Sequence, residues 1–180
     1  MNKKKAYDSR YMRMAYIIAE ASHARKKKVG CLIVKGTTII SDGFNGMPSG
    51  MANDCEIPNY CRSLAYPDEK LDRLDFMTEK EWLEYDMEQI KGAVCHIPIS
   101  YTTKIEVLHA ESNALMKLAR STQSSVGATL YTTLSPCIEC SKLIIQADIG
   151  LVIYDEDYKD NPGLQLLERA GIPFEKINLK

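Results

Sequence analysis

The 180-residue chain lacks any apolar run that approaches the roughly 20 residues needed to cross a bilayer. It also lacks a basic excess, because 23 Lys and Arg residues are balanced by 24 Asp and Glu residues, for a net charge of −1. Proteins that bind nucleic acid non-specifically usually carry such an excess. The basic start, Lys3 to Lys5, has no apolar stretch behind it and does not resemble a secretory signal, so we expect it to be a mobile terminus. We therefore expect no membrane association, no nucleic-acid partner and a cytoplasmic location.

Internal repeats and low-complexity tracts are also absent, and the rest of the composition is typical of a globular protein. Apolar residues make up 45% of the chain and charged residues 26%. A chain of 180 residues can bury a substantial core. The segment 42–106 is much longer than an ordinary connection. We therefore expect a single domain over 1–180, with an insertion at about 51–105.

Apolar periodicity predicts the order of helices and strands. A helix over 7–24, with Asp8 or Ser9 as its cap, precedes a hairpin of two strands, 29–35 and 38–41. A capping box predicts a helix over 78–90 inside the insertion. The later elements alternate: helix 108–120, strand 128–133, helix 137–147, strand 151–154, a helix capped by Asn161 that begins at Pro162 and ends before Gly171, and strand 174–179. This order implies a sheet between layers of helices.

The chain has six cysteines: Cys31, Cys55, Cys61, Cys95, Cys137 and Cys140. Without a secretory signal the compartment is expected to be reducing, where closely spaced cysteines more often bind metal or do redox chemistry. Only Cys137 and Cys140 are closely spaced, and they lie at a predicted helix start, where thiolates are favoured. A redox pair and a structural zinc site are the alternatives. However, a redox pair usually opens the first helix of its unit, and a closed zinc site would need another close pair.

His109 and Glu111 lie at the start of the preceding predicted helix. Zinc prefers tetrahedral nitrogen and sulfur ligands, and a catalytic zinc keeps one position open. His109, Cys137 and Cys140 supply three such ligands. Residues two apart do not share a helix face, so Glu111 reaches the same place only from the first turn, where it can carry protons. The motifs His-x-Glu and Pro-Cys-x-x-Cys are together the signature of zinc nucleobase deaminases.

With these motifs and the segment Gly-Phe-Asn-Gly-Met-Pro-Ser-Gly at 43–50, the chain resembles the cytidine/deoxycytidylate deaminase superfamily. The zinc motifs are typical of the whole superfamily, and the glycine segment points to its dCMP branch. The resemblance runs from about 11 to 174 and implies a three-layer α/β/α fold around a mixed central sheet of about five strands. It implies that zinc on His109, Cys137 and Cys140 activates water. Glu111 would then move protons to N3 and the amino group of cytosine, giving dUMP, a thymidylate precursor, and ammonia.

The resemblance also implies binding residues and effectors. Asn45, Ser135 and Arg120 are expected to contact dCMP, although an asparagine before a glycine is also common in plain turns. A regulatory site is expected to bind dCTP as activator and dTTP as inhibitor, with Mg²⁺ on the triphosphate, in a homo-hexamer. The loop of Gly46, Pro48 and Gly50 is expected to offer accessible amides, and two lysines are added because phosphate recognition needs cations. The expected residues of the regulatory site are Gly43, Phe44, Asn45, Gly46, Pro48, Gly50, Lys26 and Lys28.

Some relatives carry a second, structural zinc. Here Ala24 and Val107 stand where its ligands can lie, which argues against the usual second site. An alternative second site remains open, and its candidate ligands are Cys55, Cys61, Cys95 and His96. Two other functions also remain open. One is a deaminase that edits tRNA or single-stranded nucleic acid, and the other is a non-catalytic zinc-binding module.

Overall fold

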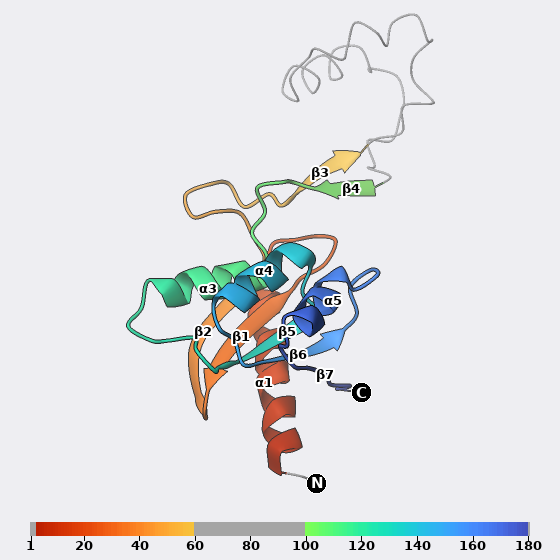
Figure 1. The fold of residues 1–180 in the computed structure, drawn as a ribbon. Coiled ribbons are helices and arrows are strands. Elements are labelled where there is room, and N and C mark those ends of the chain that lie inside the picture. The colour runs from red at the N-terminus through yellow and green to blue at the C-terminus, as the bar shows by residue number, and fades with distance from the viewer. Residues whose placement is uncertain (1–2, 60–99, 180) are drawn as a thin grey trace, which may run out of the picture. The chain divides into compact units, whose positions relative to one another are not determined.

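The computed structural model describes residues 3–59 and 100–179, which divide into two compact units (Figure 1). The first unit comprises 1–56 with 103–180, and the second comprises 57–102. The strands β3 (Glu56–Asn59) and β4 (Ser100–Thr103) pair with each other as a two-stranded sheet. The predicted helix over 78–90 lies outside the described residues. That the chain is one domain with an insertion stays a prediction.

The first unit is built on a five-stranded sheet in the order β2-β1-β5-β6-β7. Its strands are β1 (Gly30–Lys35), β2 (Thr38–Phe44), β5 (Thr129–Leu134), β6 (Leu151–Glu156) and β7 (Phe174–Lys176). β1 runs antiparallel to both β2 and β5, whereas β5, β6 and β7 run parallel to one another. The predicted mixed sheet and hairpin are therefore confirmed.

Helices cover both faces of this sheet. They are α1 (Lys3–Glu20), α3 (Ala110–Ala119), α4 (Ile138–Gln146) and α5 (Pro162–Arg169). Successive side chains of a strand point to opposite faces. Accordingly, Cys31 and Ile33 of β1 join one core cluster with α3, α4 and α5, and Leu32 and Val34 join a second cluster with α1. The predicted three-layer fold is confirmed (Figure 1). No helix in the described part of the chain is both long and apolar enough to span a membrane.

The first helix differs from its prediction at both ends. It begins by Lys3, so neither Asp8 nor Ser9 caps it, and it ends at Glu20 rather than at 24. Asp8 instead accepts a buried hydrogen bond from the hydroxyl of Tyr131 in β5, at 2.8 Å. Lys3 to Lys5 are helical rather than a mobile terminus, and the ammonium of Lys4 lies 2.7 Å from the carboxylate of Glu175. Contacts to the sheet thus extend the helix beyond the local cap signal.

Candidate metal centre

Two helix starts bring the predicted metal ligands together. His109 is the N-cap residue of α3 and Cys137 the N-cap residue of α4, and both have extended backbone angles. Cys140 lies in the first turn of α4, where its backbone N–H points to the Cys137 sulfur at 3.5 Å. Because helix N-termini favour negative charge, this placement stabilises thiolates. The two helices begin one or two residues later than predicted, which puts His109 and Cys137 at the caps.

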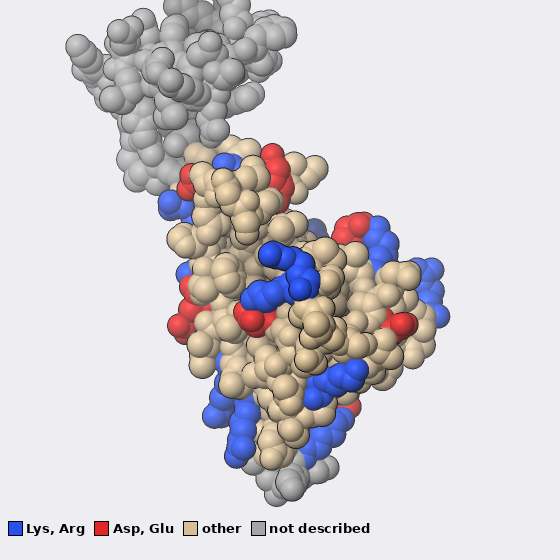
Figure 2. Space-filling view, turned by 90° about the vertical axis from the view of Figure 1, so that its left-hand side faces the viewer, with Lys and Arg blue, Asp and Glu red and all other residues tan. Residues whose placement is uncertain are grey.

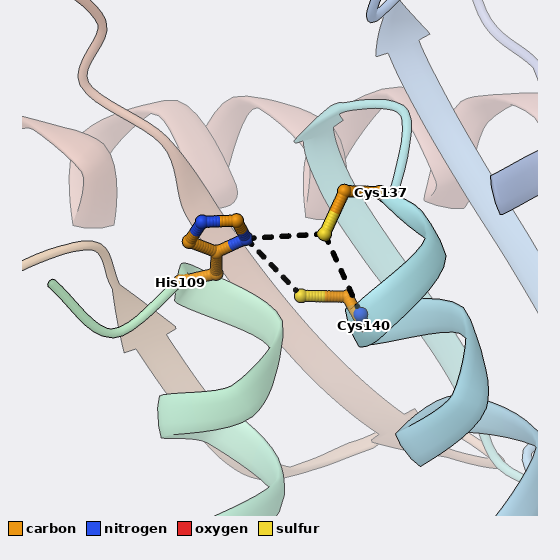
Figure 3. A group of neighbouring side chains, drawn as sticks. All are labelled: His109, Cys137 and Cys140. Atoms are coloured by element: carbon orange, nitrogen blue, oxygen red, sulfur yellow. Dashed lines mark hydrogen bonds between the residues drawn. The ribbon is translucent and has the colours of Figure 1, made fainter. Parts of the chain in front are cut away.

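The three side chains have the separations of a zinc site (Figure 3). Nδ1 of His109 lies 3.3 Å from Sγ of Cys137 and 3.4 Å from Sγ of Cys140. All three ligand atoms lie within 4.8 Å of one another. In a tetrahedral zinc site, with Zn–N of about 2.0–2.1 Å and Zn–S of about 2.3 Å, the nitrogen and sulfur would be about 3.6 Å apart. The donor set and its spacing therefore fit zinc with three protein ligands.

The two sulfurs differ in protonation. The pKa of Cys137 falls to about 4, first because it accepts a hydrogen bond from Cys140 and then because His109 is also a partner. The pKa of Cys140 is raised, first by that same hydrogen bond to Cys137 and then by burial. A divalent cation bound between the two sulfurs would favour the thiolate at both.

Glu111 lies beside this group without being one of its three members. It stands in the first turn of α3, as its spacing from His109 requires, and it is only 4% exposed. Its Oε2 accepts a hydrogen bond from the Cys140 sulfur at 3.5 Å, and burial raises the pKa of its carboxyl group. A buried carboxyl group of this kind can hold a proton or release it, as a general acid and base must.

Strand β2 fixes the position of α3, and Gly43 makes the close approach possible. A Cβ on Gly43 would lie 2.3 Å from the carbonyl oxygen of Ala110 and 2.6 Å from the nitrogen of Ala114. Asn113 adds a hydrogen bond from its Nδ2 to the carbonyl of Phe44, at 2.7 Å. Gly43 and Phe44 thus contact the helix that carries His109 and Glu111. Their predicted regulatory role stays a prediction.

Gly43→Ala is expected to lower the free energy of unfolding by about 1–3 kcal/mol, because the added methyl group would push β2 and α3 apart. Denaturant unfolding measures this change. Thr38→Ala, on the exposed part of the same strand, is the matched control and should change stability by no more than about 0.5 kcal/mol. Equal stabilities for the two variants would contradict the close packing of Gly43 on α3.

Asn45 ties the end of β2 to the segment before β1. Its Oδ1 accepts from the backbone N–H of Val29 at 2.8 Å, and its Nδ2 donates to the carbonyl of Lys27 at 2.9 Å. Its own carbonyl accepts from the hydroxyl of buried Ser22 at 2.7 Å. Asn45 is therefore more than a plain turn residue. Its contact with substrate stays a prediction.

Ser135 and Arg120, the other predicted substrate residues, lie in different places. Ser135 is 2% exposed and stands two residues before Cys137. Arg120 is the C-cap residue of α3, at the opposite end of the helix from His109. At 1.5 Å per residue, a ten-residue helix separates them by about 15 Å. The structure does not bring Arg120 to the metal centre.

The glycine segment does not offer the row of accessible amides that its composition predicts. The N–H of Asn45 donates to Val29, that of Gly46 to Leu108, and that of Met47 to the side chain of Asn53. Gly46 and Leu108 pair in both directions, at 3.1 and 2.9 Å, so this segment fastens the residue before His109. The expectation of an accessible amide is therefore wrong for Gly46.

The outer part of the segment and the two lysines are more exposed. Pro48 accepts a hydrogen bond from the N–H of Met51, and Gly50 has a φ of +91°. The backbone N–H of Lys26 donates to Oε1 of Glu56 at 3.3 Å, and the ammonium of Lys28 donates to the carbonyl of Glu20 at 3.3 Å. Both lysine side chains lie on the surface.

Three of the positions considered for a second zinc form an apolar contact. Ala24, Cys55 and Val107 are buried together, with Met47 packed against them. Cys61, Cys95 and His96 lie outside the residues that the structure describes. Cys31 is fully buried in the core, as predicted.

Sequence reasoning missed the residues that surround the Cys137 turn. Asn161 is the N-cap residue of α5, as predicted, but its side chain makes no cap hydrogen bond. Its Oδ1 accepts instead from the hydroxyl of Ser135 at 2.6 Å, and the backbone of Tyr158 bonds to the same hydroxyl. Gly163, in the first turn of α5, packs against the Pro136 carbonyl. The only sign of this close packing in the sequence was Gly163, directly after Asn161 and Pro162.

Comparison with known proteins gives one consistent result. Residues 5–156 match the family model described as the cytidine and deoxycytidylate deaminase zinc-binding region. The deoxycytidylate deaminase of Enterobacteria phage T4 is 33% identical over 189 residues, which cover 91% of this chain and 86% of that protein. The deoxycytidylate deaminase of Saccharomyces cerevisiae is 29% identical over 96% of this chain and 45% of that protein. The crystal structure of the dCMP deaminase from cyanophage S-TIM5, in complex with dCMP and dUMP, is similar with a TM-score of 0.69 and 30% identity, covering 98% of this chain and 99% of that one.

Proposed function

Since the chain belongs to the cytidine and deoxycytidylate deaminase family of zinc-binding proteins, we propose that it hydrolyses dCMP to dUMP and ammonia. The observation that carries the proposal is a three-ligand zinc centre with a buried carboxyl group beside it. Three protein ligands leave a fourth position for water, as catalytic zinc sites do. The names of the phage relatives support dCMP as the substrate.

The chemistry divides between the metal and the protein. Zinc bound by His109, Cys137 and Cys140 supplies the Lewis acidity that activates water near neutral pH. Glu111 takes the proton of the attacking water and delivers a proton to N3 of cytosine, which makes C4 more electrophilic. It would then take the second proton of the added water from the new C4 hydroxyl group and pass it to the amino group, which leaves as ammonia when the C4–N bond breaks and C4=O forms. The burial of Glu111 suits both transfers, because it stabilises the protonated form between them.

Asn45 and Ser135 are the proposed substrate contacts that adjoin residues next to the metal ligands, Asn45 through a β-bridge and Ser135 along the chain. Asn45 precedes Gly46, which pairs with Leu108 next to His109, and Ser135 precedes the Pro136–Cys137 turn. The side-chain amide of Asn45 and the hydroxyl of Ser135 already have protein partners. A substrate contact there would therefore share or replace those hydrogen bonds. Arg120, at the far end of α3, is the weakest of the three assignments.

Regulation is also part of the proposal, and it rests on the resemblance of the glycine segment. We propose that dCTP with Mg²⁺ activates the enzyme, that dTTP inhibits it, and that a cytoplasmic homo-hexamer couples the sites and supplies dUMP for thymidylate synthesis. Gly50, Lys26 and Lys28, which are exposed, and Pro48, which is half-buried, are the candidates for nucleotide contact.

Steady-state kinetics test the regulation. The dCMP saturation curve is expected to be sigmoidal, to become hyperbolic with dCTP and Mg²⁺, and to be suppressed by dTTP. Curves that neither nucleotide changes would remove the regulatory role of the glycine segment.

The alternative substrate is tRNA or single-stranded nucleic acid. On the face shown in Figure 2, the described Lys and Arg side chains fall in separate groups with uncharged surface and acidic residues between them. This distribution does not form one continuous basic surface for a strand on that face. A non-catalytic zinc module is the other alternative, but such a module has no need of a buried Glu111 beside the metal ligands.

A deaminase assay decides between these functions. The purified protein is supplied in turn with dCMP, deoxycytidine and a cytosine-containing oligonucleotide, and ammonia release is measured. Turnover is expected with dCMP and not with the oligonucleotide. Turnover with the oligonucleotide alone would contradict the proposed substrate, and no turnover with any of them would favour the non-catalytic module.

A further inference from the structure

The turn that presents Cys137 to the metal centre is fastened to the loop between β6 and α5. The hydroxyl of Ser135 accepts a hydrogen bond from the backbone N–H of Tyr158 at 2.6 Å and donates one to Oδ1 of Asn161 at 2.6 Å. Ser135 is 2% exposed, so water does not compete for these bonds. One buried hydroxyl thus links the approach to Cys137 to two points on the loop.

The first turn of α5, which follows this loop, also packs against the turn. A Cβ on Gly163 would lie 2.0 Å from the carbonyl oxygen of Pro136 and 2.8 Å from the carbonyl carbon of Cys137. The first turn of α5 therefore lies directly against the peptide that carries the ligand. The backbone N–H of Ser135 adds a bond to the carbonyl of Glu156 at 2.8 Å. Residues 135–137 are thus held by several contacts from residues 156–163.

The backbone of Asn161 is specialised for this contact. Its φ is +43°, a left-handed conformation that asparagine tolerates better than most residues. In this conformation the side chain bonds to Ser135 and does not cap α5. Such a conformation costs of order 1–3 kcal/mol and persists only where surrounding contacts over-determine it. The bond to Ser135 is one such contact.

We propose that Ser135 is a positioning residue for the zinc ligand Cys137, and that its hydroxyl acts through the Pro136–Cys137 turn. The inference rests on the zinc centre of the proposed function. Outer partners that hold a metal ligand in place typically account for 10–100-fold in metal affinity. A turn that is fixed before the ion binds leaves less of the chain to be ordered on binding.

The test is zinc affinity, measured by competition with a chelator, in Ser135→Ala. We expect binding to weaken by about 10–100-fold, because the turn loses its anchor. The Co²⁺-substituted protein should show altered sulfur-to-cobalt absorption. Tyr131→Phe is the matched control, because its hydroxyl is also buried and donates to the carboxylate of Asp8 at 2.8 Å, in the core cluster that packs on α1. This control should keep the zinc affinity and the cobalt spectrum of the wild type.

A second variant reaches the same contact from the loop. Asn161→Gly removes the acceptor of the Ser135 hydroxyl but keeps the left-handed backbone accessible. It should weaken zinc binding in the same direction, and it decides the question if Ser135→Ala does not fold. Wild-type affinity in Asn161→Gly, or equal weakening in Tyr131→Phe, would overturn the positioning role. A wild-type protein that binds no zinc would overturn the proposed function as well.

Discussion

Glu111→Gln is expected to lower the dCMP turnover number by about 100- to 10,000-fold, the range that general acid–base catalysis typically contributes. Glutamine has nearly the same shape as glutamate, but its amide cannot take a proton from water and return it to the base. Because Glu111 is 4% exposed, bulk water is poorly placed to substitute for it. Turnover is measured together with zinc content by metal analysis, and the variant should still hold one zinc per chain.

Glu139→Gln is the matched control for this prediction. Glu139 also lies in the first turn of a metal-binding helix, between Cys137 and Cys140, but its side chain is 71% exposed and pairs with Lys142. This variant should keep both zinc and turnover. If Glu111→Gln retains wild-type turnover, Glu111 does not carry the protons. If it loses zinc, its main role is structural.

Cys137→Ser is expected to remove both zinc and turnover. A serine hydroxyl does not ionise near neutral pH, whereas the pKa of the Cys137 thiol is about 4. The loss of a direct ligand should lower zinc affinity by more than the roughly 100-fold that the loss of an outer partner costs. Chelator competition and metal analysis measure the effect, and dCMP turnover should fall in parallel.

Cys55→Ala provides the comparison. Cys55 is 1% exposed and packs in the apolar cluster with Ala24 and Val107, so its removal should cost some stability and leave zinc in place. If Cys55→Ala lost a zinc while Cys137→Ser kept one, the metal would lie at a different site. A wild-type content of two zinc ions per chain would likewise show that a second site exists.

The metal centre could be predicted from sequence because its geometry is largely local. Cys137 and Cys140 are three residues apart at one helix start, and His109 and Glu111 are two apart at another. The central sheet brings these two helix N-termini together, and the mixed order of its strands follows from the alternation of helices and strands.

The errors fall where distant residues compete with a local signal. Asp8 is of a residue type that often caps helices, but its carboxylate accepts a hydrogen bond from the hydroxyl of Tyr131, 123 residues away. Asn161 is of the same kind, but its side-chain oxygen accepts a hydrogen bond from Ser135 and not from the first turn of α5. The amides of the glycine segment were expected to be free, and Val29 and Leu108 accept from two of them. A single sequence does not contain these partners in any local pattern.

Zinc K-edge X-ray absorption spectroscopy of the purified protein tests the central claim most directly. The account predicts one zinc per chain with two sulfur ligands at about 2.3 Å and two lighter ligands, one of them imidazole, at about 2.0–2.1 Å. A shell of four sulfurs, or a protein without zinc, would contradict it.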